Sequence, residues 1–214
     1  MGFQVKGLLN KERENEDKHS EFTADNMKRP DSNAETHLWN SFKSGEPKAL
    51  ETIFKAHFQY LFDYGMRITK QEELVKDCIQ DIFAYLWEKR QNLSKVRSIR
   101  VYLIVSLRRT LLKALDKQAR FILLQKEIGQ EQAYETLSFE DLLIIKEKEA
   151  NEKRTLKTVI QKIPARMREA LYLKIYQKLP YKEIAVIMNV RPQVARNYVS
   201  EAFKRLREIL STKL

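Results

Sequence analysis

Cationic and amide side chains crowd one stretch near the C-terminal end of the chain, residues 184–207. Such side chains donate hydrogen bonds to phosphates and to the base edges of the DNA major groove. An apolar stripe at helical spacing in this stretch leaves the following residues facing outward: Arg191, Gln193, Arg196, Asn197, Ser200, Lys204 and Arg205. The chemistry that these residues predict is recognition of duplex DNA.

A helix-turn-helix is the arrangement that would position these side chains. Met188 closes the apolar face of a short first helix, Asn189 tolerates the left-handed backbone of a tight turn, and Pro192 suits the first turn of the next helix. An ordinary helical hairpin with a solvated basic side is the alternative. The small residues Ala185 and Ala195 favour the helix-turn-helix, because they let two crossing helices approach closely.

A second polar face is expected on a helix over residues 72–89. The polar residues of this face are Asp77, Gln80, Asp81 and Glu88. Two aromatic residues, Phe83 and Trp87, flank them. Every amphipathic helix has a polar side, so a solvated surface is one explanation. The other is a docking surface, on which carboxylates engage a basic partner helix and the rings supply affinity.

A second basic cluster begins in the turn before a predicted helix over residues 99–118. It contains Lys95, Arg97 and Arg100, followed on one helical face by Tyr102, Ser106, Arg109 and Lys113. An aromatic ring among cations suits an unstacked base beside its phosphates. The alternative is a solvated basic face at whose margin Tyr102 packs.

Charge is unevenly distributed along the 214 residues, whose formal net charge is +11. Residues 91–120 and 153–214 are strongly basic, whereas residues 121–152 are acidic. Two basic blocks around an acidic spacer indicate two separate contacts with a polyanion.

The helical spacing of apolar residues, without alternation of period two, predicts an all-α fold of two helical domains. A disordered tail is expected over residues 1–36. Helices over residues 38–43, 49–64, 72–89 and 99–118 would form a first domain, 37–118. A flexible linker over 119–137 would lead to a second domain, 138–214. That domain would contain a helix from Ser138 to before Pro164, a helix over 166–178 and the helix-turn-helix.

Other classes of protein lack support in the sequence. The one cysteine, Cys78, excludes an internal disulfide and fits the reducing cytoplasm. The start of the chain lacks the pattern of a secretory signal, and no apolar run is long enough for membrane insertion. His19, His37 and His57 are scattered, and no metal-ligand spacing or phosphate-binding glycine loop occurs. We therefore expect no cofactor and no enzymatic activity.

In order, these segments resemble a bacterial RNA polymerase sigma factor of the sigma-70 family, in the extracytoplasmic-function group. Residues 77–90, DCIQDIFAYLWEKR, are similar to the family's segment that docks on the coiled coil of the polymerase clamp. The resemblance implies that core RNA polymerase is a partner, and it implies these polymerase-binding residues: Asp77, Gln80, Asp81, Phe83 and Trp87.

The resemblance also implies promoter DNA as a partner. Residues 95–117 are similar to the part that melts and recognises the −10 element, and residues 179–207 to the part that recognises the −35 element. Tyr198 thereby joins the −35 set, although the family often has arginine there. Arg109 and Lys113 also differ from the family's usual Asn and Asp. The base preferences are therefore not transferred to this chain.

The family precedent adds an anti-sigma factor as a partner. Two alternatives remain open on the sequence alone. One is a free-standing helix-turn-helix regulator that dimerises on symmetric half-sites. The other is a nucleic-acid-processing enzyme, which lacks a recognisable acid–base or metal constellation here.

Overall fold

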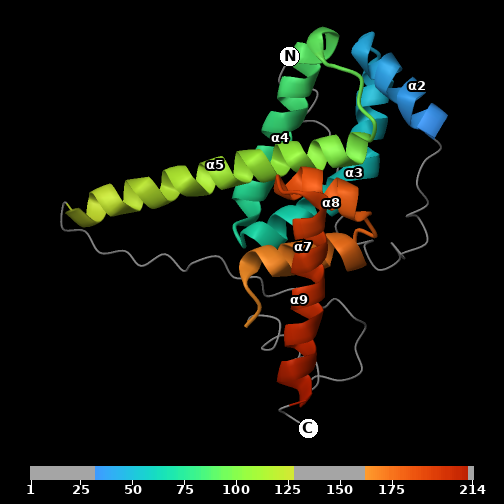
Figure 1. Ribbon diagram of the computed structural model, residues 1–214. Helices are drawn as coiled ribbons and strands as arrows, with labels where there is room; N and C mark the ends of the chain where they lie inside the picture. The colour runs from blue at the N-terminus through green and yellow to red at the C-terminus, as the bar shows by residue number, and fades with distance from the viewer. Residues whose placement is uncertain (1–31, 128–161, 212–214) are drawn as a thin grey trace, which may run out of the picture. The chain divides into compact units, whose positions relative to one another are not determined.

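The structure is a computed structural model that describes residues 32–127 and 162–211 (Figure 1). Within these residues the secondary structure is helical and contains no strand, so the predicted all-α fold is confirmed there. The elements are α2 (Ser32–Lys43), α3 (Pro47–Ile68), α4 (Glu72–Lys89), the 3-10 helix η3 (Arg90–Asn92), α5 (Ile99–Glu127), α7 (Ala165–Ile175), α8 (Tyr181–Met188) and α9 (Pro192–Ser211).

Helix α4 begins and ends where the sequence predicts. Helix α5 does not, because it continues past Gln118 to Glu127, and the linker predicted to begin at residue 119 is wrong at that end. Residues 119–127 contain no glycine or proline, and they are rich in good helix formers. Residues 32–36 belong to α2 rather than to the predicted tail. The tail up to residue 31 and the helix predicted from Ser138 lie outside the described residues.

The chain divides into two compact units. One comprises Met1–Phe62 with Lys76–Leu107, and the other comprises Asp63–Val75 with Arg108–Leu214. The first unit buries apolar side chains from α2, α3, α4 and α5, and the most deeply buried include Trp39, Phe42, Ile53, Phe54, Ile79, Phe83, Ile99, Leu103 and Ile104. Burial of each such side chain stabilises the folded unit by roughly 1.5–3 kcal/mol relative to leaving the side chain exposed. The packed core therefore fixes the helices, and with them the residues on the surface of the unit.

The second unit contains α7, α8 and α9. Their shared core is formed by Leu171, Leu173, Ile184, Ile187, Ala195, Val199 and Ala202. At the end of α3, Gly65 permits a close approach to the start of α4, since a Cβ there would lie 2.5 Å from Val75 Cγ1.

A buried ion pair connects α7 to α5 inside the second unit. Arg108 donates from Nε to Glu169 at 2.7 Å, and the Tyr64 hydroxyl donates to the same carboxylate at 2.7 Å. Burial, followed by the neighbouring Glu169, raises the pKa of Tyr64 well above its usual range, so the hydroxyl remains a donor. Loss of one partner would leave a buried charge uncompensated, at a cost of about 3–5 kcal/mol.

His57 makes the stability of the first unit depend on pH. It is 9% exposed, and burial, followed by Arg100, lowers its pKa from 6.5 to about 4. Between these pH values the unfolded chain binds a proton at His57 that the folded chain does not. We therefore expect the free energy of unfolding to fall by about 3 kcal/mol across this window as pH is lowered. Urea unfolding at a series of pH values measures this slope.

A His57→Leu variant is the control for that slope. Leucine cannot take up a proton, so the part of the pH dependence that comes from position 57 should disappear. An identical slope in the two proteins would contradict the assignment.

Candidate functional site

The turn between α8 and α9 has the predicted geometry. Asn189 adopts the left-handed conformation, with φ 53° and ψ 54°, and its amide donates back to the last turn of α8. Pro192 is the first residue of α9, where a missing amide proton costs nothing. Ala185 and Ala195 are both buried, as expected where the helices cross. The helix-turn-helix prediction is confirmed.

Helix α9 presents one exposed polar face. At about 100° per residue, its members fall within roughly 100° of the helical circumference: Gln193, Arg196, Asn197, Ser200 and Lys204. Gln193 Nε2 donates to Asn197 Oδ1 at 3.0 Å, which orders two amides side by side. Arg191 is exposed just before the helix, and its carbonyl accepts from the amides of Val194 and Ala195. The structure thus brings six predicted residues to the start and one face of α9.

Two predicted −35 residues do not belong to this face. Tyr198 and Arg205 lie roughly 180–200° around α9 from Arg196, and both are only partly exposed. Arg205 Nε instead contacts the Glu201 carboxylate at 3.0 Å. The sequence analysis included Arg205 as an outward-facing residue and Tyr198 through the family resemblance, whereas helical spacing places both on another side of α9.

Arg196 is held by an aromatic ring. Its guanidinium lies 5.4 Å from the centroid of Tyr181, the first residue of α8, and Lys174 Nζ lies 4.7 Å from the same ring. A ring that contacts two cations limits their freedom while leaving their other donors toward solvent. The sequence analysis did not identify Tyr181 as part of this site. It is the first residue of α8, just before the helix-turn-helix stretch that the sequence analysis describes.

Helix α4 presents the acidic face that the sequence predicts. Asp77 and Asp81 are exposed and Gln80 is half-buried. Trp87 is also half-buried, borders the face on the Gln80 side and lies under the Arg90 guanidinium at 4.5 Å. Four of the five predicted polymerase-binding residues therefore reach the surface.

Phe83 was predicted as an aromatic anchor of this face, and that prediction is wrong. It is 1% exposed and packs edge-on against Phe54 with ring centroids 5.0 Å apart. Two residues beyond Asp81, it lies roughly 200° around the helix and therefore in the core. The exposed ring on the acidic side is Tyr85, four residues after Asp81 and 57% exposed, which the sequence interpretation missed.

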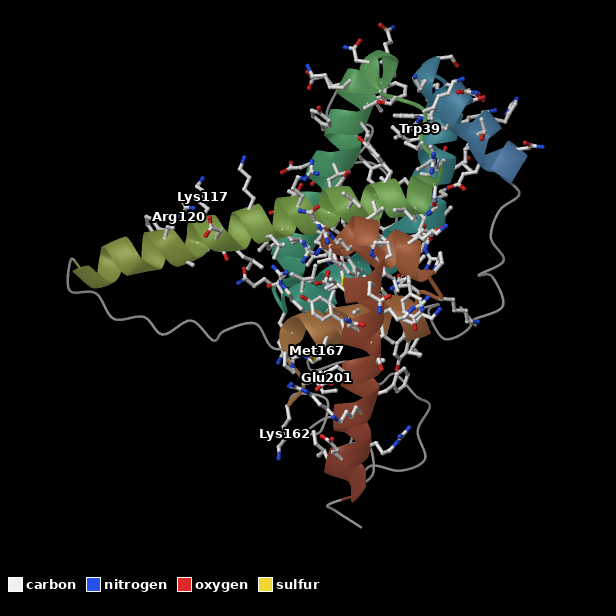
Figure 2. The ribbon with its side chains drawn as sticks, in the orientation of Figure 1. Trp39, Lys117, Arg120, Lys162, Met167 and Glu201 are labelled. Carbon is white, nitrogen blue, oxygen red and sulfur yellow. The ribbon has the colours of Figure 1, made fainter. Side chains whose placement is uncertain are left out.

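The basic cluster before and within α5 is largely solvent-facing. Lys95, Arg97, Arg109 and Lys113 are exposed, as is Lys117 further along the helix (Figure 2). Arg100 is half-buried, with its guanidinium 4.9 Å from the Tyr60 ring centroid. Exposed cations thus lie both in the loop before α5 and on α5 itself.

Tyr102 and Ser106, like Arg100, have contacts within the protein. Tyr102 is half-buried and packs edge-on against Trp39 of α2 at 5.6 Å, and the Ser106 hydroxyl donates to the Tyr102 carbonyl at 2.9 Å. Tyr102 therefore packs at the margin of the core and is only partly exposed.

Cys78 is buried, as predicted for a small core residue. Burial, followed by Asp81 and Asp77, raises its pKa to about 11, which keeps the thiol protonated and unreactive. Across residues 32–127 and 162–211, no cluster of His, Cys, Asp and Glu could hold a metal ion. In the same residues, none of the helices combines the length and apolar character that a bilayer crossing requires.

Comparison with known families adds independent information. A family model described as Sigma-70 region 2 matches residues 53–121, and one described as Sigma-70, region 4 matches residues 153–206. Together they match more than half of the chain. No curated protein sequence matches it.

Solved structures of the same fold exist. The chain is similar to the sigma factor RpoE in complex with the anti-sigma factor NepR from Bartonella quintana, with 19% identity and a TM-score of 0.53 over 77% of this chain and 95% of that one. It is also similar to CnrH in complex with the cytosolic domain of CnrY, with 16% identity and a TM-score of 0.58 over 85% of this chain and 99% of that one. At these identities the similarity concerns the fold.

Proposed function

The chain belongs to the sigma-70 family of RNA polymerase sigma factors, and we propose that it is a promoter-specificity subunit of the extracytoplasmic-function group. Sigma factors bind core RNA polymerase and direct it to promoter DNA, so this chain serves the initiation of transcription. The observation that carries the group assignment is that the region 2 match, which ends at residue 121, is followed after a short spacer by the region 4 match, which begins at residue 153.

We assign polymerase docking to the exposed acidic face of α4. Asp77, Gln80 and Asp81 would contact cations on the coiled coil of the clamp, and Trp87 and Tyr85 would supply apolar contact area at its edges. Phe83 contributes from within the core, by holding α4 against α3.

We assign the −10 element to the loop after η3 and the start of α5. Lys95, Arg97, Arg109 and Lys113 would neutralise phosphates of the separated strand, and the half-buried Tyr102 would stack its ring on an unstacked base. Arg100 is also in this set; it is half-buried, with its guanidinium against the Tyr60 ring.

We assign the −35 element to the exposed face of α9. Arg196, held over Tyr181, would contact a base edge or phosphate in the major groove, together with Gln193, Asn197, Ser200 and Lys204. Arg191 would contact the DNA backbone from the turn before the helix. These contacts are non-covalent, so the mechanism that we propose is non-enzymatic and polymerase makes every new bond.

The fold relatives suggest how such a protein is controlled. Both were solved with a partner bound, which in the case of RpoE is an anti-sigma factor. We propose that an anti-sigma factor also binds this chain. The proposed function places the chain with polymerase and chromosome in the bacterial cytoplasm.

Run-off transcription tests the proposed function. Purified chain is added to core RNA polymerase on a genomic DNA library, and we expect transcripts with defined start sites that require both components. Absence of such transcripts, together with tight binding to palindromic DNA without polymerase, would instead favour a free-standing helix-turn-helix regulator.

A further inference from the structure

Helix α2 contacts the loop that precedes α5 at two separate points. The Trp39 indole donates from Nε1 to the Ser94 carbonyl at 3.0 Å, and the Glu35 carboxylate accepts from the Ile99 amide at 2.5 Å. Ser94 and Ile99 flank the segment that carries Lys95 and Arg97. Helix α2 therefore anchors this segment at both ends. Figure 2 labels Trp39, which lies where α2 meets this part of the chain.

The two anchors suit the groups that they hold. Ile99 is the first residue of α5, whose early amides have no partner within the helix, so a carboxylate there satisfies a donor and complements the positive end of the helix dipole. Trp39 is 2% exposed, and an indole N–H in such a place needs an acceptor, which the Ser94 carbonyl supplies. Each anchor thus satisfies a buried or half-buried polar group that would otherwise be unpaired.

Aromatic contacts extend the same junction to α4 and α5. Trp39 packs against Phe42 at 5.2 Å and edge-on against Tyr102 at 5.6 Å, and Phe42 in turn contacts Trp87 at 6.4 Å. Gly45, which follows α2 with φ 94°, lies so close to Arg90 that a Cβ would stand 3.3 Å from the guanidinium Nε. Helix α2 therefore contacts both ends of the connection between α4 and α5.

The exposed cations lie between the anchors. Lys95 and Arg97 are both exposed, while the backbone on either side of them is held. A loop that is ordered before binding avoids much of the entropy cost of ordering it on the ligand. This arrangement is the one expected of a preformed binding loop.

We propose that α2 is a clasp that shapes the loop of residues 93–98 for capture of single-stranded promoter DNA, with Glu35 and Trp39 as positioning residues. The clasp lies before the Sigma-70 region 2 match, which begins at residue 53. It rests on the proposed function, because the assigned ligand of the loop is the separated −10 strand. The DNA contacts come from Lys95, Arg97 and Tyr102, and the clasp acts through them.

Two variants test the clasp in holoenzyme assembled from the full chain and core polymerase. Trp39→Phe keeps a ring but removes the indole donor, and Glu35→Ala removes the acceptor of the Ile99 amide. The probe is a fluorescent single-stranded oligonucleotide with the non-template sequence of a promoter mapped for the wild-type holoenzyme. We expect each variant to bind it about tenfold more weakly, with unchanged affinity for core polymerase.

Conservative and surface variants separate positioning from general damage. Glu35→Gln keeps a carbonyl acceptor and should bind within about threefold of wild type. His37→Ala and Asn40→Ala change exposed residues of the same helix and should bind like wild type. Amide hydrogen exchange of residues 93–99 should accelerate in Trp39→Phe and Glu35→Ala and in neither surface control.

The outcomes are distinguishable. If wild-type holoenzyme binds no single-stranded promoter DNA, the proposed −10 function fails. If wild type binds but Trp39→Phe and Glu35→Ala bind equally well, the clasp is overturned while the proposed function stands. Unchanged hydrogen exchange over residues 93–99 in both variants would also overturn the clasp, whatever the DNA result.

Discussion

The double substitution Asp77→Ala with Gln80→Ala is expected to abolish co-purification of the chain with core RNA polymerase. Asp77 is exposed and Gln80 half-buried on the acidic face of α4, and neither belongs to the buried core. Central interface residues of this kind often cost 2 kcal/mol or more when truncated, and two of them would reduce affinity at least about 100-fold. Pull-down and fluorescence titration with core polymerase measure the loss.

A matched control removes one aspartate and one glutamine side chain from a different helix. Asp116→Ala with Gln118→Ala changes two exposed residues of α5 that the proposal does not assign to any partner. This control should bind core polymerase like wild type, and circular dichroism should show equal helicity in both double variants. Normal polymerase binding by the Asp77/Gln80 variant would remove the docking assignment.

The substitution Arg196→Ala is expected to weaken binding to duplex DNA that carries the −35 element by roughly tenfold to hundredfold, or about 1–3 kcal/mol. The guanidinium is exposed on α9 and held over Tyr181, so its loss removes a preordered charge. If Arg196 contacts a phosphate, the slope of log affinity against log salt should fall by about 1. Anisotropy titrations at several salt concentrations measure both quantities.

The control for this experiment is Arg166→Ala. Arg166 is an exposed arginine in the first turn of α7, within the same unit, and it lies outside the assigned DNA face. It removes the same formal charge, so any effect of net charge alone would be equal in the two variants. Equal affinity and equal salt slope for Arg196→Ala and Arg166→Ala would contradict a specific contact by Arg196.

For the acidic face of α4, the sequence predicts the polar residues of the surface correctly but misplaces one aromatic residue. The spacing of Asp77, Gln80 and Asp81 is enough to predict a shared surface, because residues three and four apart meet on any helix. The same rule, applied strictly, places Phe83 opposite Asp81 and Tyr85 beside it. The error at Phe83 therefore came from treating a nearby aromatic residue as a neighbour on the surface.

The C-terminal part of the site follows the sequence more closely. Asn189 and Pro192 each have a backbone preference that few other residues share, so these two residue types are enough to locate the turn. The partners of the charged residues do not follow from residue type in this way. That Arg205 contacts Glu201 while Arg196 lies over Tyr181 depends on which side of α9 the neighbouring helices cover.

By itself, the sequence determined the helical class of the described residues, most helix positions, the helix-turn-helix and the polar faces of α4 and α9. These features follow from periodicity and from local backbone preferences, which act within a few residues. The tertiary structure alone decided that Trp39 bonds to Ser94, that Glu35 bonds to Ile99 and that Arg108 pairs with Glu169. These partners are distant in sequence, and no local pattern encodes them. They meet because burial of the apolar faces brings their helices together.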